Sequence, residues 1–382
     1  MTNGKNSVRH SQTAQSGRLM SLDVFRGITV AFMIIVNNPG SWGHIYAPLE
    51  HSPWHGCTPT DLVFPSFLFI AGVAMYYSLK KYNFEFSRDA FFRIIRRVIL
   101  IFATGTFLTI FPYFINRDYH MLRILGVLQR IALAYGLGAI IILLVRERFV
   151  WVATAVILLG YWALMYFFGG ADPYSLKDNF ALVVDRTVLG ENHLYKGFGI
   201  PFDPEGLLST LTATGTVLLG FMVGGLINKN GKSWKTPILL SAAGTVLVIA
   251  GAIWGRFFPI NKPLWTSSYV LYAGGIAMII LSVVFIIVDI WGKKGWTGFF
   301  MVFGMNALFT FFLAGIAAKE LAYNHIGTGD DKISVGTWIY KNICCNVFTE
   351  PRMASLMFAL MMLTFIWLIG LILYKRKIFI KL

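Results

Sequence analysis

The segment between the first two apolar stretches is rich in side chains that can do acid–base chemistry. Residues 37–61 read NNPGSWGHIYAPLEHSPWHGCTPTD and contain three histidines and an aspartate. An imidazole near pKa 6.5 is the usual general base at neutral pH. His51, between the helix-exit Asn37 and the helix-entry Asp61, is therefore a candidate catalytic base. A lone histidine at a membrane interface is more often a neighbour of lipid headgroups, and this is the alternative interpretation.

A metal site in the same segment is the competing hypothesis. His51 and His55 are four residues apart, a spacing that brings two ligands together on one helix face. Pro53 between them argues against a regular helix, because proline removes a backbone donor and disrupts the helix interior. The adjacent Cys344 and Cys345 form no CxxC pair, so we expect no metal.

Arginines near apolar stretches form a second group of candidates. In RLMSLDVFRG, Arg18 and Arg26 flank Asp23, and guanidinium groups bind phosphates through paired hydrogen bonds. Asp23 and Arg26 are three residues apart, so an ion pair that eases membrane insertion is also expected. Arg130, in LRILGVLQR, is costly at membrane depth. It must either pair with Asp23 or Asp61, or line a wet cavity for a polar ligand.

The motif FDPEGLLST at residues 202–210 has the pattern of a helix start. Asp203 can cap a helix, Pro204 suits its first position, and Glu205 favours its positive end. The alternative role for these acids is to hold an amine substrate.

The composition shows which kind of element must position these residues. Of the 382 residues, 56% are hydrophobic and 13% are charged, whereas soluble domains have roughly 25% charged residues. This excludes a soluble fold and a disordered chain, and three cysteines exclude a disulfide scaffold. The net charge of +15 is explained by basic loops at an anionic membrane surface. We expect no nucleic-acid partner, since the basic residues form no continuous stripe.

Roughly ten apolar stretches are each long enough to cross a lipid bilayer as a helix. They lie near residues 20–36, 61–79, 94–114, 122–145, 149–168, 207–227, 236–257, 268–290, 297–318 and 353–374. Alternate loops on one side hold most of the lysines and arginines, which places both termini in the cytoplasm. We therefore predict an all-α polytopic membrane protein, a single bundle with a polar tail at 1–17 and one transmembrane domain at 18–382.

The polar motifs resemble the heparan-α-glucosaminide N-acetyltransferase family of transmembrane acetyltransferases. The matching stretches keep their order along nearly the whole chain: SLDVFRG (21–27), EHSPWHGCTPTDLVFPSFLFIAG (50–72), LRILGVLQR (122–130), FDPEG (202–206), NKPLWTSSYV (261–270), GMN (304–306) and YKRKIF (374–379). The resemblance implies transfer of an acetyl group from cytosolic acetyl-CoA to an amino sugar of the glucosamine type across the membrane. Compared with the lysosomal member, we expect this chain to lack an N-terminal luminal region and a first membrane helix.

The resemblance also implies roles for single residues. The family's catalytic histidine falls on His51 and its partner asparagine on Asn37. We expect His51 to deprotonate the attacking amine and Asn37 to stabilise the oxyanion, while Asp61 orients the imidazole or holds the sugar. A relay through acetyl-histidine is the alternative mechanism, and His55 receives no catalytic role. The residues that bind CoA fall on Arg18, Arg26 and Arg130.

Two other functions remain open from the sequence. An O-acyltransferase that modifies a glycan of the cell envelope would use the same histidine. A sugar transporter would also need a polar mouth and a buried arginine, although no inverted repeat is evident. We expect an integral protein of a bacterial inner (plasma) membrane, with the lipid bilayer and a glycan substrate as partners. A homodimer is implied by the resemblance.

Overall fold

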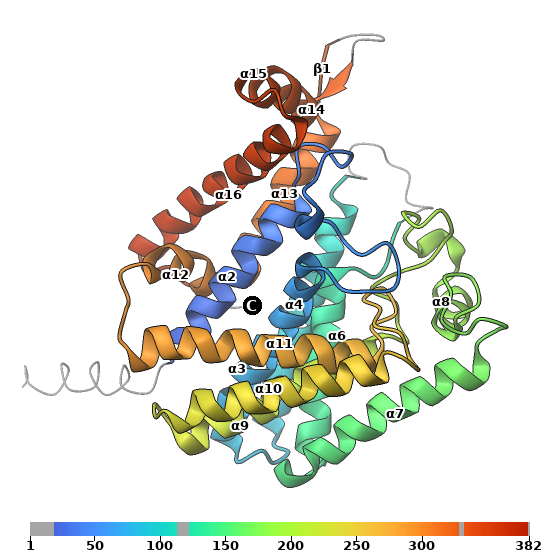
Figure 1. The fold of residues 1–382 in the computed structure, drawn as a ribbon, viewed down its shortest axis with the longest axis vertical. Coiled ribbons are helices and arrows are strands. Elements are labelled where there is room, and N and C mark those ends of the chain that lie inside the picture. Colours follow the sequence, from blue (N-terminus) through green and yellow to red (C-terminus); the bar gives the residue numbers. More distant parts are fainter. Residues whose placement is uncertain (1–18, 113–121, 328–331, 381–382) are drawn as a thin grey trace, which may run out of the picture.

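The computed structural model describes residues 19–112, 122–327 and 332–380 (Figure 1). Arg18, one of the expected donor-binding residues, lies outside the described residues. The helices of six or more residues are α2 (Met20–Asn37), α3 (Val63–Leu79), α4 (Arg88–Ile110), α6 (Val127–Leu144), α7 (Val150–Phe168), α8 (Phe180–Leu189), α9 (Thr210–Asn230), α10 (Lys235–Trp254), α11 (Ser267–Phe285), α12 (Thr297–Met305), α13 (Ala307–Tyr323) and α16 (Pro351–Lys375). The shorter elements include the 3-10 turns η1 (Ala47–Leu49) and η2 (Pro59–Leu62), the helices α14 (Val335–Ile339) and α15 (Cys345–Val347), and the antiparallel strands β1 (His325–Ile326) and β2 (Ile333–Ser334).

Most of the expected apolar stretches form helices that suit a membrane. Within the described residues, eight helices are long and apolar enough to cross one. The third expected stretch is α4, which begins at Arg88 and has further arginines in its first turns. The all-α polytopic fold class is confirmed.

The ninth expected stretch is bent. A single straight helix was expected over 297–318, but α12 and α13 meet at an angle of 83°. The break falls at Asn306, whose backbone leaves the helical region (φ −126°, ψ 39°). Hydropathy could not reveal this bend, because both halves are apolar and a contact with residues after α16 accompanies it.

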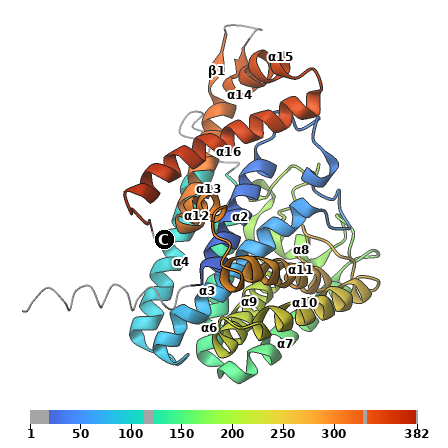
Figure 2. The ribbon, with the colours of Figure 1, turned by 60° about the vertical axis from the view of Figure 1, so that its left-hand side comes forward.

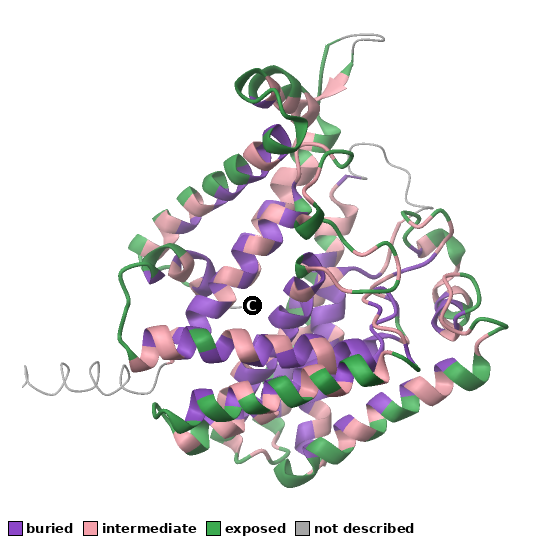
Figure 3. Ribbon diagram, in the orientation of Figure 1, coloured by how far each residue is buried: buried purple, intermediate pink, exposed green. Residues whose placement is uncertain are grey.

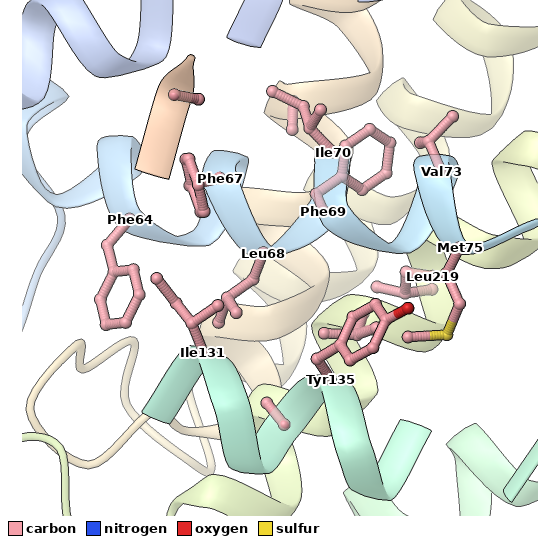
Figure 4. Close-up of a cluster of buried hydrophobic side chains, with 14 of the residues drawn as sticks. Phe64, Phe67, Leu68, Phe69, Ile70, Val73, Met75, Ile131, Tyr135 and Leu219 are labelled. Atoms are coloured by element: carbon pink, nitrogen blue, oxygen red, sulfur yellow. The ribbon is translucent and has the colours of Figure 1, made fainter. Parts of the chain in front are cut away.

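Helix α3 lies at the centre of the bundle, and α7, α10 and α16 lie at its outside (Figure 3). In α3 and its flanking turns, 72% of the apolar window is buried, against 28%, 28% and 33% for the three outer helices. Figure 4 shows Leu68 of α3 pointing toward Ile131 of α6, and Met75 of α3 beside Tyr135 of α6 and Leu219 of α9. A helix that is apolar all round must be covered on every side, whereas the exposed apolar sides of outer helices suit lipid.

Glycines bring the backbones of α3 and α9 into contact. A Cβ atom on Gly72 would lie 2.0 Å from the carbonyl oxygen of Val217, and one on Gly220 would lie 2.0 Å from that of Phe69. Small residues allow such approach in membrane bundles, where close packing drives helix association. The contact fixes α3 against the bundle, and Asp61 lies in η2 directly before this helix.

Several basic loops gather at one end of the bundle, which we name the basic end. Lys80 Nζ bonds to Asn228 Oδ1 at 2.9 Å. Lys232 Nζ pairs with Asp289 Oδ1 at 2.9 Å, and Asp289 also accepts from the backbone nitrogen of Ser21 at 3.1 Å. The start of α2 and the ends of α3, α9 and α11 therefore lie together.

The loops with the histidine-rich segment gather at the other end, which we name the histidine end. Trp54 Nε1 donates to the carbonyl of Tyr174 at 3.0 Å, and Asn261 Nδ2 donates to that of Trp54 at 3.0 Å. The backbone nitrogen of Ile124 donates to the carbonyl of His193 at 3.2 Å. The two groups of loops follow the alternation expected from sequence. Which side of the membrane each end faces stays a prediction.

Candidate active site

His51 and Asp61 meet at the histidine end. His51 Nδ1 lies 2.7 Å from Asp61 Oδ1. The carboxylate of Asp61 is 2% exposed, and its Oδ2 accepts from the backbone nitrogens of Ser52 and Thr58 at 3.0 Å each. Thr58 and Asp61 form a capping box at the start of η2, which satisfies free backbone donors at a helix start. The local sequence TPTD therefore fixes the carboxylate in place.

This contact decides which nitrogen of His51 is available. In the tautomer with its proton on Nδ1, His51 donates to the ionised carboxylate and Nε2 carries the lone pair. The His51 side chain is 45% exposed, and a substrate can therefore reach it. Such an arrangement suits a general base.

Lys262 joins this pair from the loop between α10 and α11. Its Nζ lies 3.1 Å from His51 Nδ1 and 3.5 Å from Asp61 Oδ1. Burial lowers the pKa of Lys262 below its usual value, and the charges of Asp61 and Glu205 offset part of this effect. The ammonium lies close enough to the carboxylate of Asp61 to offset its negative charge.

The loop that carries Lys262 is held by its neighbour Asn261, which is fully buried. Asn261 Nδ2 contacts His55 Nδ1 at 3.3 Å as well as the backbone of the same segment, and its Oδ1 accepts from the backbone nitrogen of Leu264 at 2.7 Å. His55 thus contacts Asn261 while His51 contacts Asp61. The two imidazoles have different partners, and the contact of His55 with Asn261 connects the histidine-rich segment to the loop that carries Lys262.

Asn37 is the last residue of α2, at the histidine end. Its side chain is exposed and makes no hydrogen bond to any residue within the described ranges. The neighbouring Asn38 is buried, and its amide donates to the carbonyl of Ile34 at 2.7 Å. Of the two asparagines, Asn38 therefore ends the helix and Asn37 is available to a ligand.

The expected ion pair of Arg130 with Asp23 or Asp61 is wrong. Arg130 is fully buried near the histidine end, and its Nη2 donates to the carbonyl of Gly206 at 3.1 Å and to Ser209 Oγ. Its Nε and Nη1 have no hydrogen-bond partner among the described residues. The Arg130 side chain points from α6 toward the residues just before α9. The spacing of residues within one motif could not predict this contact.

The expected helix start at Pro204 is also wrong, since α9 begins at Thr210. Asp203 and Glu205 instead bind one arginine. Arg123 Nε lies 2.9 Å from Asp203 Oδ2 and its Nη2 2.6 Å from Oδ1, while Nη2 also contacts Glu205. A buried carboxylate needs such a partner, and the motif FDPEG therefore has a structural role at the histidine end.

Arg26 lines a cavity of about 290 Å³ in the half of the bundle toward the basic end. Its Nη1 lies 3.3 Å from Asp23 Oδ1, which confirms the expected ion pair, and 3.3 Å from the carbonyl oxygen of Gly304. Arg97 of α4 and Tyr135 of α6 line the same cavity. Arg97 Nε is buried and unpartnered within the described ranges. An unpaired guanidinium nitrogen beside a second arginine fits the phosphates of an anionic donor.

Sequence reasoning missed Lys262 and Arg97. Lys262 lies in the motif NKPLWTSSYV, but no local spacing connects it with His51. Arg97 belongs to the basic run RIIRR, which is explained equally well by the charge of a loop near the membrane surface. In both cases the informative contact is between distant segments.

Comparison with known proteins connects these features. Residues 18–184 match the family model described as heparan-alpha-glucosaminide N-acetyltransferase, catalytic. In this part the chain is similar to the heparan-α-glucosaminide N-acetyltransferase family. It is 26% identical to the heparan-alpha-glucosaminide N-acetyltransferase of Mus musculus, over 79% of this chain and 54% of that protein. It is 27% identical to the protein of that name from Homo sapiens, over 77% of this chain and 52% of that protein.

The chain thus spans about half the length of the curated relatives it matches. The part that matches the N-acetyltransferase family model contains His51, Asp61, Arg26 and Arg97. Lys262 lies beyond that part, and its place beside His51 and Asp61 comes from the tertiary structure.

Proposed function

We propose that this chain is a transmembrane N-acetyltransferase, which moves the acetyl group of acetyl-CoA onto an amino sugar of the glucosamine type. The observation that carries the proposal is the pairing of an oriented histidine at one end with an arginine-lined cavity toward the other. A donor with several phosphates is too charged to cross lipid. Its nucleotide would therefore stay toward the basic end while its thioester reaches the histidine.

Helix α3 provides the connection between the two places. Phe67, Ala71 and Ala74 line the cavity from one face of α3, and Asp61 lies just before this helix. A rise of about 1.5 Å per residue places these three side chains roughly 9 to 20 Å from the level of Asp61. The cavity thus lies along the path that an acyl-carrying arm must follow.

The proposed chemistry uses His51 as a general base. Nε2 takes a proton from the acceptor amine as its nitrogen attacks the thioester carbonyl carbon. The C–N bond forms, the C–S bond breaks, and the imidazolium returns its proton to the leaving sulfur. The side-chain amide N–H of Asn37 would donate a hydrogen bond to the oxyanion that forms between these two steps. Asp61 would hold the imidazole in its reactive tautomer.

The arginines would hold the donor. Arg18, Arg26 and Arg97 are proposed to bind its phosphates from the basic end, since guanidinium forks pair two oxygens at once. Arg130 is proposed as a further contact nearer the thioester, because two of its buried nitrogens are unpaired. We also propose a bacterial inner membrane as the location, with the basic end in the cytoplasm, and a homodimer as the working form.

A vesicle assay tests the function directly. Proteoliposomes are loaded with glucosamine, and acetyl-CoA is added to the outer solution. Only the protein molecules whose basic end faces outward can then use this donor. We expect N-acetylglucosamine inside the vesicles and free CoA outside. Movement of unmodified sugar without acetylation would instead identify a transporter. An ester product that hydroxylamine cleaves would identify an O-acyltransferase, and a labelled acetyl-enzyme would identify the histidine relay.

A further inference from the structure

The chain after α16 turns back toward the bend between α12 and α13. Lys377 adopts the left-handed conformation (φ 57°), and its backbone nitrogen donates to the carbonyl of Tyr374 at 3.0 Å. The nitrogen of Ile378 donates to the carbonyl of Leu373 at 2.9 Å. These two bonds form a Schellman motif, which ends a helix and reverses the chain. Glycine is the usual residue at this position. Here the turn forms although the residue is a lysine.

Asn306 holds the returning segment at the break between α12 and α13. Its Nδ2 donates to the carbonyl of Ile378 at 3.1 Å, and its Oδ1 accepts from the backbone nitrogen of Ile380 at 2.8 Å. The Asn306 side chain is buried, with 1% of its surface exposed. A buried amide left unpaired is costly, so these two bonds tie residues 378–380 to the bend. Helix α16 itself packs across α12 and α13 (Figure 2).

The tied segment forms a wall of the arginine-lined cavity. Ile380 lines it together with Arg26, Arg97 and Gly304. Three basic residues, Lys375–Lys377, precede the wall within a few residues, and all three are exposed. The cavity is therefore lined by two half-buried arginines and by Ile380, which follows this cationic turn in the chain.

We propose that residues 376–380 are part of the donor site. Ile380 would contact the bound donor, and Arg376 and Lys377 would bind its phosphates from the side of the cavity, with Asn306 as the positioning residue. This inference rests on the proposed function and deepens it, because it names the segment that recognises the nucleotide phosphates of the donor. Charge-assisted bonds to phosphate are the strong ones, and a segment fixed in advance loses little freedom on binding.

The test measures CoA binding to the purified full chain in detergent, with a matched control. In Arg376→Gln/Lys377→Gln, two exposed cations are lost while side-chain length is kept. We expect CoA affinity to fall roughly tenfold or more and the KM for acetyl-CoA to rise similarly, with kcat little changed. The control Lys229→Gln/Lys235→Gln removes two exposed cations, one in the last turn of α9 and one at the start of α10, and should bind CoA as the unaltered protein does.

A second measurement follows Asn306. Hydrogen exchange of the amides of residues 376–380 should slow when CoA is added to the unaltered protein. In Asn306→Ala these amides should exchange faster and CoA should bind more weakly. Equal CoA affinity in the Arg376→Gln/Lys377→Gln variant and its control, with no protection of this segment, would overturn the inference and leave the acetyltransferase proposal standing. Failure of the unaltered protein to bind CoA would instead remove the proposed function itself.

Discussion

The ammonium of Lys262 lies 3.5 Å from the carboxylate of Asp61, although the two residues belong to loops far apart in the sequence. The Lys262 side chain is 18% exposed and that of Asp61 is 2% exposed. Both also contact Nδ1 of His51. The imidazole therefore lies in contact with one negatively and one positively charged group.

Replacement of Lys262 should move the pH dependence of the reaction. In Lys262→Met, Asp61 is no longer balanced, so the imidazole keeps its proton to higher pH and is a base only above that pH. We expect the rising limb of the kcat/KM profile to shift to higher pH, with lower activity at pH 7. Lys262→Arg keeps the charge and should keep most of the profile. An unchanged profile in Lys262→Met would argue that the lysine is merely structural.

Loss of either proposed catalytic side chain should affect turnover more than donor binding. We expect Asn37→Ala to lower kcat about 10²–10³-fold, as for loss of one oxyanion donor, and His51→Ala to abolish detectable turnover. CoA affinity, measured in the same detergent, should stay close to that of the unaltered protein. Near-normal turnover in either variant would show that the residue has another role.

Removal of Arg123 should destabilise the histidine end. Asp203 is fully buried, and Arg123→Ala leaves its charge unpaired, a cost of about 3–5 kcal/mol for a buried pair. The thermal midpoint in detergent should fall clearly. Arg186→Ala is the control, because its partner Glu191 is 60% exposed and such surface pairs contribute about 0–1 kcal/mol. Similar midpoints for the two variants would contradict the buried role of Arg123.

Asp185 should make stability depend on pH. Burial raises the pKa of this carboxyl from 3.8 to about 6, while its Oδ1 accepts from the backbone nitrogens of Leu207 and Leu208. Since the folded state holds the proton more tightly, the stability that Asp185 contributes at low pH is lost between about pH 4 and pH 6. Asp185→Asn keeps an acceptor oxygen and carries no charge. Its thermal midpoint should exceed that of the unaltered protein at pH 8 by several degrees.

At pH 4 the thermal midpoints of the Asp185→Asn variant and the unaltered protein should differ little. The exposed Asp178 provides the control, since Asp178→Asn should show no comparable dependence on pH. A constant difference between the Asp185 variant and the unaltered protein at both pH values would contradict the prediction.

The contact between α3 and α9 should not tolerate a methyl group. In Gly72→Ala the new Cβ would meet the Val217 carbonyl oxygen, so the helices must separate, at a cost of about 1–3 kcal/mol. Gly160 in α7 has nothing within 4 Å of its Cβ position, and Gly160→Ala should be neutral or slightly stabilising. A midpoint for Gly72→Ala equal to that of Gly160→Ala would argue against close packing there.

Local patterns predicted much of this protein. Hydropathy located the long apolar helices but not the shorter α8, α14 and α15, and the i,i+3 spacing of Asp23 and Arg26 predicted their ion pair. The prediction that His51 and Asp61 act together rested on their nearness in one loop, and the structure brings them within 2.7 Å. Such features succeed because burial in lipid and contacts within a few residues depend on the local sequence alone.

The rest required the packed bundle. The partners of Arg130 and Asp203, the bend at Asn306 and the places of Arg97 and Lys262 all depend on contacts between segments far apart in the chain. A buried polar group takes whichever partner the neighbouring helix presents, and that choice depends on the rotation and depth of both helices. The sequence by itself determined a helical membrane bundle with a histidine–aspartate pair at one end. Only the tertiary structure decided which charges surround that pair and which arginines share a cavity.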